Sequence, residues 1–242
     1  MKNCLLKSEN LVVEHHKTTF VRKINLECLA GDIVLVIGVN GSGKTSLMNL
    51  MSGHQELLQG DVFFKENNIK GLSIKSKASF SSYLPQFIEK IDDLFVKDYL
   101  EMGLNQSNPA INTLLDMINI NSLLDKKMGQ LSGGELKKLA FYSSLKANPT
   151  VLLLDEPLQN LDPQTKLMFK NVILGFAKLG KGIVITSHDF LWTTNFANKV
   201  YGIHENELIE GTMEPSFFSK VMKYPFIKQN TSIVPETGVI GD

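Results

Sequence analysis

Three short apolar runs limit the fold of this chain more than any other feature of its sequence. Ile33 to Ile37, Val151 to Leu154 and Ile183 to Thr186 are rich in Ile, Val and Leu and lack the alternation of a half-exposed strand. Such runs are typical of strands buried on both faces of a parallel sheet. Each is followed at once by a polar or glycine-bearing turn. Ligands of open α/β sheets bind at such turns, so the runs predict an α/β fold with a mostly parallel central sheet and a ligand site at the carboxyl ends of its strands.

Two helices with clear ends are predicted between these strands. Lys44 to Ser52 forms the first, and Gly53 stops it. Pro163 to Leu179 forms the second, which Asp162 can cap and Gly180 can end. Its apolar residues recur at helical spacing and predict one buried face. They are Phe169, Val172, Ile173, Phe176 and Leu179.

The other segments predict smaller parts around this sheet. A small antiparallel β subdomain is expected from three strand-like segments, which are Leu11 to Glu14, Phe20 to Leu29 and Asp61 to Lys65. Residues 90–147 are mostly helical in pattern and predict a helical subdomain. We therefore expect a single domain over residues 1–212, followed by a peripheral C-terminal tail over residues 213–242.

The balanced charge gives no sign of a general affinity for nucleic acid and leaves local basic patches as the one alternative. The 242 residues include 25 Lys and Arg and 25 Asp and Glu, so no basic field attracts nucleic acid or an anionic membrane. Cys4 and Cys28 match no metal-binding spacing, and we expect reduced thiols in a cytosolic protein. Residues 1–17 lack the apolar stretch of a signal peptide, and no run approaches the roughly 20 apolar residues of a membrane helix. A function at a membrane would therefore need a second chain.

The segment Gly38-Val39-Asn40-Gly41-Ser42-Gly43-Lys44-Thr45 follows a predicted strand and opens a predicted helix. This is the context in which a glycine-rich phosphate loop is expected, because the glycines turn backbone N–H groups toward phosphate oxygens. Lys44 is expected to neutralise the β- and γ-phosphates of ATP, and the Thr45 hydroxyl to ligate Mg²⁺. Ser46, the next residue of the helix, completes the predicted ATP-binding set.

Polar residues also follow the second and third runs. Asp155 and Glu156 end the second, and buried carboxylates need a cation or hydrogen-bond donors. We expect Asp155 to bind Mg²⁺, partly through water, and Glu156 to polarise the attacking water as catalytic base. The third run ends in Ser187-His188-Asp189, where adjacent residues cannot converge as a catalytic triad. His188 is instead expected to act in catalysis as a sensor of the γ-phosphate.

A further motif, Leu131-Ser132-Gly133-Gly134-Glu135, precedes a predicted helix and forms another N–H-rich helix start, which predicts a second anion site. Six motifs then occur in one order between Leu11 and Gly211. They are the phosphate loop, Tyr83-Leu84-Pro85-Gln86, the Leu131–Glu135 motif, Val151–Pro157, Asn160-Leu161-Asp162 and Ser187-His188. In this order they resemble the ATPase domains of ABC proteins, which have a P-loop NTPase fold of the ABC type. The compact layout is similar to that of bacterial subunits such as the cytochrome c biogenesis ATPase CcmA.

The resemblance implies a composite ATP site made by two such domains. They pair head to tail, as a homodimer or as a heterodimer with another ABC ATPase domain. Each ATP then lies between the phosphate loop of one chain and the Leu131–Glu135 motif of the other, whose residues from Ser132 onward contact ATP in trans. The resemblance further implies that Asp162 lies at the dimer seam, and that Gln86 is catalytic and senses both Mg²⁺ and the transmembrane partner.

The resemblance also implies a function in transport. The chain would hydrolyse ATP with Mg²⁺ to power separate transmembrane subunits, whose coupling helices residues 90–147 would receive. It would be cytoplasmic and peripheral, on the cytoplasmic face of the inner (plasma) membrane. The alternative is a soluble ABC ATPase of an assembly system such as iron–sulfur cluster biogenesis, which the intact Asp155-Glu156-Pro157 segment and the Leu-Ser-Gly-Gly signature disfavour.

Two positions depart from the family pattern. The signature motif of the family usually ends in Gln where this chain has Glu135. We still expect ATPase activity with this substitution. The aromatic residue that stacks on adenine corresponds to His15, whose imidazole stacks less strongly than a tyrosine ring. His15 and His16 are equally well explained as two exposed histidines at the end of a strand.

Overall fold

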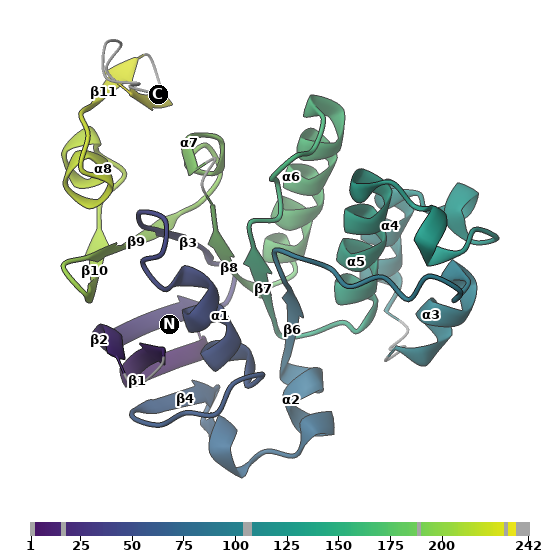
Figure 1. The fold of residues 1–242 in the computed structure, drawn as a ribbon, viewed down its shortest axis with the longest axis horizontal. Coiled ribbons are helices and arrows are strands. Elements are labelled where there is room, and N and C mark those ends of the chain that lie inside the picture. The colour runs from purple at the N-terminus through teal and green to yellow at the C-terminus, as the bar shows by residue number, and fades with distance from the viewer. Residues whose placement is uncertain (1–2, 16–17, 104–107, 188–189, 230–231, 236–242) are drawn as a thin grey trace.

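The computed structural model describes residues 3–15, 18–103, 108–187, 190–229 and 232–235. Figure 1 shows a central sheet with an antiparallel part at the lower left and the helices α3, α4 and α5 at the right. The strands are β1 (Cys4–His15), β2 (Thr18–Leu29), β3 (Ile33–Ile37), β4 (Asp61–Phe64), β5 (Asn67–Asn68), β6 (Ser81–Leu84), β7 (Val151–Asp155), β8 (Gly182–Thr186), β9 (Lys199–His204), β10 (Glu207–Gly211), β11 (Phe226–Gln229) and β12 (Ser232–Pro235). The α-helices are α1 (Lys44–Ser52), α2 (Ile74–Phe80), α3 (Val96–Met102), α4 (Pro109–Ile118), α5 (Gly133–Lys146), α6 (Pro163–Lys178), α7 (Phe190–Thr193) and α8 (Pro215–Met222).

Ten strands form one mixed sheet in the order β5-β4-β1-β2-β10-β9-β3-β8-β7-β6. The five strands from β9 to β6 are parallel to one another, and every residue of β3, β7 and β8 is buried. The predicted parallel core strands are therefore confirmed. Asp155 at the end of β7 pairs in register with Thr186 at the end of β8, so the polar residues that follow the two strands lie at the same edge of the sheet.

The predicted antiparallel part is confirmed as well, although its first strand is longer than predicted. β1 pairs antiparallel with β2 and β4, and it begins at Cys4 instead of Leu11. The added half contains Ser8, which is only 1% exposed. Its hydroxyl donates to the carbonyl oxygen of Ile24 at 3.2 Å and accepts from the N–H of Leu26 at 3.0 Å. Ser8 interrupts the apolar pattern by which a buried strand is predicted. Its hydrogen bonds compensate for the burial of its hydroxyl.

The ends of α6 follow from its capping residues. Asp162 is the N-cap, Pro163 is the first helical residue, and Gly180 follows the helix with a left-handed φ of 75°. The predicted buried face is confirmed for its first four members, but it is wrong for Leu179, which is 42% exposed. Leu179 lies beyond the last helical residue, where the side chain no longer follows the buried stripe of the helix.

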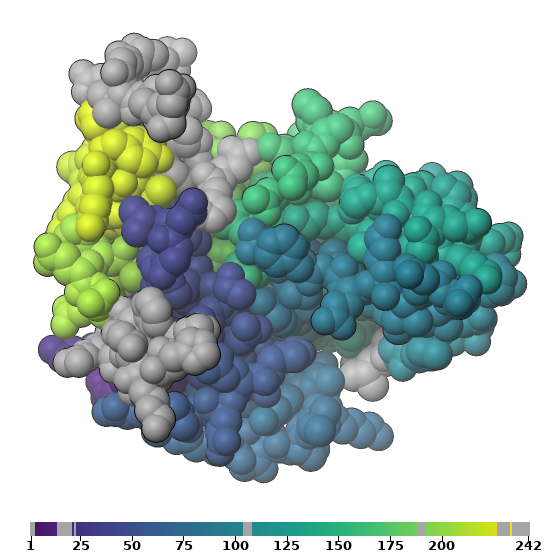
Figure 2. All heavy atoms as spheres, viewed as in Figure 1, coloured from purple at the N-terminus to yellow at the C-terminus, as the bar shows by residue number. Residues whose placement is uncertain are grey.

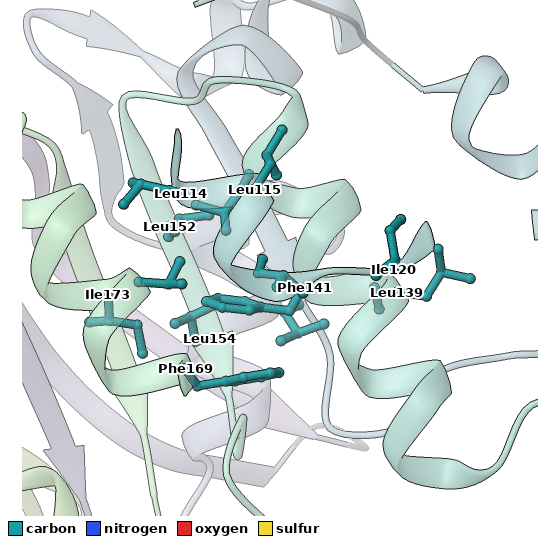
Figure 3. Close-up of a cluster of buried hydrophobic side chains, with 14 of the residues drawn as sticks. Leu114, Leu115, Ile120, Leu139, Phe141, Leu152, Leu154, Phe169 and Ile173 are labelled. Atoms are coloured by element: carbon teal, nitrogen blue, oxygen red, sulfur yellow. The ribbon is translucent and has the colours of Figure 1, made fainter. Parts of the chain in front are cut away.

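Residues of α4, α5, α6 and β7 share one buried cluster (Figure 3). The rings of Phe141 from α5 and Phe169 from α6 stack with centroids 4.1 Å apart. Leu114 of α4 and Leu152 of β7 belong to the same cluster, and both are buried. This packing fixes the position of α5, which begins within the Leu131–Glu135 motif, relative to the strand that ends in Asp155.

The C-terminal residues differ from the peripheral tail predicted from Met213 onward. α8, β11 and β12 form a compact unit, and their apolar side chains pack against β3 and β9. The buried cluster that they share consists of Leu35, Ile37, Val200, Phe218, Val221, Phe226 and Ile233. These elements are too short for a periodic sequence pattern to predict them, since α8 has only eight residues and the strands have four each. Figure 2 shows this segment (yellow) and the helical region (teal) at opposite ends of the molecule.

No helix in the described ranges combines the length and the apolar character that a bilayer crossing requires.

Candidate active site

The loop from Gly38 to Thr45 joins the end of β3 to the start of α1. Gly41 and Gly43 have φ angles of 74° and 97°, a left-handed conformation that glycine adopts without strain. The hydroxyl of Ser42 is buried and has no hydrogen-bond partner within the described ranges. Backbone N–H groups at the start of a nine-residue helix, a curled glycine loop and an unbonded hydroxyl together favour the binding of an anion.

Lys44 supplies a positive charge under this loop. It is 7% exposed, and its Nζ donates to the carbonyl oxygens of Gly38 at 2.8 Å and Val39 at 3.2 Å. Burial lowers the pKa of Lys44, whereas the negative charges of Glu156 and Asp155 raise it. The amine thus contacts backbone oxygens of the loop, and its positive charge would attract a phosphate group there.

The loop faces a cleft of about 820 Å³. Most of the predicted ATP-binding residues line it, together with the predicted base Glu156 and with Gln86. The lining residues are Asn40, Gly41, Ser42, Gly43, Lys44, Thr45, Ser46, Gln86, Glu156 and Gln159. The structure therefore brings the phosphate loop, Gln86 and Glu156 together around one space.

Asp155 ends β7 with no exposed surface. One of its carboxylate oxygens accepts a hydrogen bond from the Thr186 hydroxyl, and the other accepts one from the Tyr83 hydroxyl at 3.5 Å. Burial and the Asp155 charge raise the pKa of Tyr83, so this hydroxyl stays protonated and able to donate. The three residues come from three neighbouring strands and hold the carboxylate in a fixed orientation.

Glu156 follows with a left-handed backbone, at a φ of 49°, and is 3% exposed. Its N–H lies 3.2 Å from both the carbonyl oxygen and the hydroxyl oxygen of Thr186. A positive φ costs energy for a residue other than glycine and is common at functional sites. Here it turns the chain at the strand end, where Glu156 lines the same cleft as the phosphate loop.

Gln86 lies in the segment that follows β6. Its side-chain Nε2 donates to Oε1 of Gln159 at 3.1 Å, and both side chains line the cleft. An amide at this place provides an oxygen that suits a hard cation such as Mg²⁺. Thr45 also lines the cleft, whereas Asp155, predicted to bind Mg²⁺ partly through water, is not among its lining residues.

The Leu131–Glu135 motif contains the start of α5. Ser132 is its N-cap and makes a reciprocal capping box with Glu135, whose Oε2 accepts from the Ser132 N–H at 2.9 Å. Lys126 lies 2.8 Å from the other oxygen of Glu135, and this contact is the first cause that lowers the pKa of Glu135 to about 2. Gly133 and Gly134 leave open space where a side chain would be. None of these residues lines the 820 Å³ cleft of the same chain.

The structure describes the side chain of one of the three remaining predicted site residues, Asp162. The carboxylate of Asp162 caps α6, accepting from the Thr165 N–H at 2.9 Å and from the Thr165 hydroxyl at 2.6 Å, which confirms its role as a helix cap. These hydrogen bonds lower the pKa of Asp162. The side chain of His15 and the whole of His188 lie outside the described residues.

Sequence reasoning missed three residues around the two carboxylates. Tyr83 and Thr186 hold Asp155, and Lys137 donates to the carbonyl oxygen of Glu156 at 2.7 Å. A signal for Lys137 existed, because it lies four residues before Phe141 and therefore on the buried stripe of α5. A charged residue on such a stripe indicates a specific partner.

Comparisons with known proteins identify the family. Residues 21–159 match the protein family described as "ABC transporter". The zinc import ATP-binding protein ZnuC of a Wolbachia species is 30% identical over 190 residues, which cover 78% of this chain and 75% of that protein. The lipopolysaccharide export system ATP-binding protein LptB of Escherichia coli is 28% identical over 213 residues, covering 84% and 88%. A putative ABC transporter ATP-binding protein of Clostridium tetani is 27% identical over 220 residues, and the chain spans 50% of its length.

Solved structures share the fold. A nucleotide-free ATP-binding cassette from an ABC transporter superposes with a TM-score of 0.76 at 22% identity, covering 90% of this chain and 94% of that one. A dimeric ATP-binding cassette in a post-hydrolysis state with ADP and Pi gives a TM-score of 0.75 at 20% identity, covering 86% and 98%. At these identities the likeness establishes the fold.

Proposed function

Because the chain belongs to the ABC transporter family, as an ATP-binding subunit with ATPase activity, we propose that it closes head to tail with a second ABC ATPase domain to power separate transmembrane subunits. The observation that carries this proposal is the shared cleft, whose lining includes both Lys44 of the phosphate loop and Glu156. The relatives ZnuC and LptB are named for opposite directions of transport, import and export, so the proposal covers the energy-coupling step alone.

The proposed site binds ATP by its phosphates. The β- and γ-phosphate oxygens accept hydrogen bonds from the loop N–H groups and from Lys44, whose charge offsets theirs. The oxygens of Thr45, Gln86 and, through water, Asp155 would hold Mg²⁺, which would offset charge on the phosphates. His15 is proposed to stack on adenine.

The proposed chemistry is an in-line attack of water on the γ-phosphate. Glu156 accepts a hydrogen bond from this water and orients it, while His188 contacts the γ-phosphate. A second domain supplies Ser132 and the glycines after it to the same phosphate. Support for this arrangement comes from the position of the motif, which lies outside the cleft of its own chain on an exposed helix start.

Lys44→Ala is expected to weaken ATP binding by about 10- to 100-fold, since hydrogen bonds to charged groups contribute about 1.5–3 kcal/mol. Equilibrium titration with a fluorescent ATP analogue measures the dissociation constant. Glu156→Gln is the matched comparison, because Glu156 is proposed to act on water and to contribute little to ATP affinity. An unchanged dissociation constant for Lys44→Ala contradicts the phosphate-loop assignment.

A groove on another face is the proposed contact for the transmembrane subunits. It measures about 880 Å³ and lies between α2 and β6 on one side and α3 and α5 on the other. Phe87 and Ile74, which line it, are 81% and 87% exposed. Large apolar side chains with this exposure, gathered at one groove, are typical of protein-interaction sites. Gln86 precedes Phe87, so the segment connects the groove to the ATP cleft. We propose that this contact holds the protein on the cytoplasmic face of the membrane.

Phe87→Glu is expected to abolish co-purification of a multi-span membrane protein from mild-detergent extracts of the native host, because a charge in an apolar interface is desolvated without a partner. Quantitative mass spectrometry of the affinity-purified protein measures the loss. Leu58→Glu is the control, since Leu58 is 72% exposed but lies outside the groove. Recovery of soluble iron–sulfur assembly factors in place of a membrane protein contradicts the proposed partner.

A further inference from the structure

Lys137 is a buried cation for which the proposed reaction has no direct use. It lies in the first half of α5 and is 8% exposed. Its Nζ donates to the carbonyl oxygens of Glu156 at 2.7 Å and Gln159 at 3.4 Å. Burial lowers the pKa of Lys137, whereas the charges of Glu156 and Asp155 oppose this shift. Burying an amine is unfavourable unless specific partners compensate, and here the partners are two backbone oxygens of the turn that carries Glu156.

This turn needs external support. Glu156 has a left-handed φ of 49°, and the N–H of Gln159 closes the turn on the Glu156 carbonyl oxygen at 3.3 Å. The same oxygen accepts the shorter bond from Lys137. Conformations with positive φ persist at such residues when surrounding contacts fix them. Lys137 therefore holds the turn at its first and last residue.

Lys137 does not line the cleft that contains Lys44 and the side chain of Glu156. Its ammonium group instead contacts the backbone oxygens of Glu156 and Gln159, so its role is separate from direct contact with a substrate in that cleft. It also connects two functional segments, because α5 begins directly after Ser132. The Lys137 side chain is thus a direct contact between α5 and the backbone of Glu156.

We propose that Lys137 is a positioning residue for ATP hydrolysis, which fixes the Glu156–Gln159 turn and links it to the helix that begins after Ser132. This inference rests on the proposed role of Glu156 as the residue that orients water. Displacement of a reacting group by about 1 Å can slow a reaction by about 100-fold. Removal of the Lys137 hydrogen bonds therefore lowers the turnover rate, while the phosphate loop still binds ATP.

The test compares three variants of the full chain in steady-state ATPase assays and ATP titrations. Lys137→Met keeps the length of the side chain and removes the donors, and a drop in kcat of about 10- to 100-fold is expected, with KM and the ATP dissociation constant within about threefold of the parent. Lys137→Gln, which retains an uncharged donor, is expected to recover part of kcat. Lys138→Met is the matched control on the next residue, and its kcat is expected to equal that of the parent.

Two results overturn the inference. One is a kcat for Lys137→Met within twofold of the parent value. The other is a parallel loss of kcat, ATP affinity and thermal midpoint in both Lys137 variants, which marks a general structural role. Failure of the proposed function has a different signature, because Glu156→Gln then hydrolyses ATP as fast as the parent, whatever Lys137 does.

Discussion

Replacement of Glu156 by Gln is expected to lower the kcat of ATP hydrolysis by about 10²- to 10⁴-fold, which is the usual loss when a general base is removed. The amide keeps the size of the side chain but is a poor base. The left-handed turn at Glu156 and its hydrogen bonds to Thr186 involve the backbone, so the substitution leaves them in place. ATP binding through the phosphate loop is therefore expected to remain, and the closed dimer to persist because its ATP is not consumed.

Phosphate release measures this loss, and size-exclusion chromatography with ATP measures the persistence of the dimer. Glu156→Asp is a useful companion variant, since it keeps the carboxylate and shortens its reach. If Glu156→Gln hydrolyses ATP at a rate close to that of the parent, Glu156 is not the base.

Ser132→Arg is expected to reduce ATPase activity to background while leaving ATP binding intact. The arginine fills the open space at the start of α5, where the second domain's γ-phosphate is proposed to lie. Ser132→Ala separates this steric effect from the loss of the helix cap, because capping alone contributes about 1 kcal/mol. We expect Ser132→Ala to retain more activity than Ser132→Arg.

Mixing Ser132→Arg with Lys44→Ala tests the arrangement in trans. In a mixed dimer, the intact Lys44 of one chain faces the intact Ser132 of the other, so one of the two sites is complete. ATPase activity of the mixture is expected to exceed that of either variant alone. Full activity of Ser132→Arg by itself refutes the composite site.

The parts of the fold that could be predicted are those with local signals. β3, β7 and β8 are buried runs of Ile, Val and Leu, and α6 has Asp162, Pro163 and Gly180 at its ends. β1 could be predicted only in its second half, because Ser8 interrupts the apolar pattern and is compensated by hydrogen bonds to a neighbouring strand. The bonds that make Ser8 compatible with the core depend on the register of β1 and β2, which the sequence of β1 alone does not contain.

The same distinction separates the parts of the site. The phosphate loop and the Asp155-Glu156 pair are continuous segments, so their spacing predicts them. Tyr83 lies 72 residues from Asp155 along the chain, and Lys137 lies 19 residues from Glu156. Contacts at such separations arise from the packing of β6 and α5 against β7. A hydrophobic pattern predicts that these elements are buried, but it does not predict which polar side chains meet between them.

The C-terminal segment gives the ATPase a larger cooperative unit than its motifs suggest. Phe218 and Ile233 share a core with Leu35 and Ile37 of β3, and β3 leads directly into the phosphate loop. Removal of α8, β11 and β12 exposes the apolar side chains of β3, the strand that leads into Gly38. Packing of the C-terminal segment and binding of nucleotide are therefore thermodynamically linked, since a ligand that binds the folded loop also stabilises the core that the loop shares.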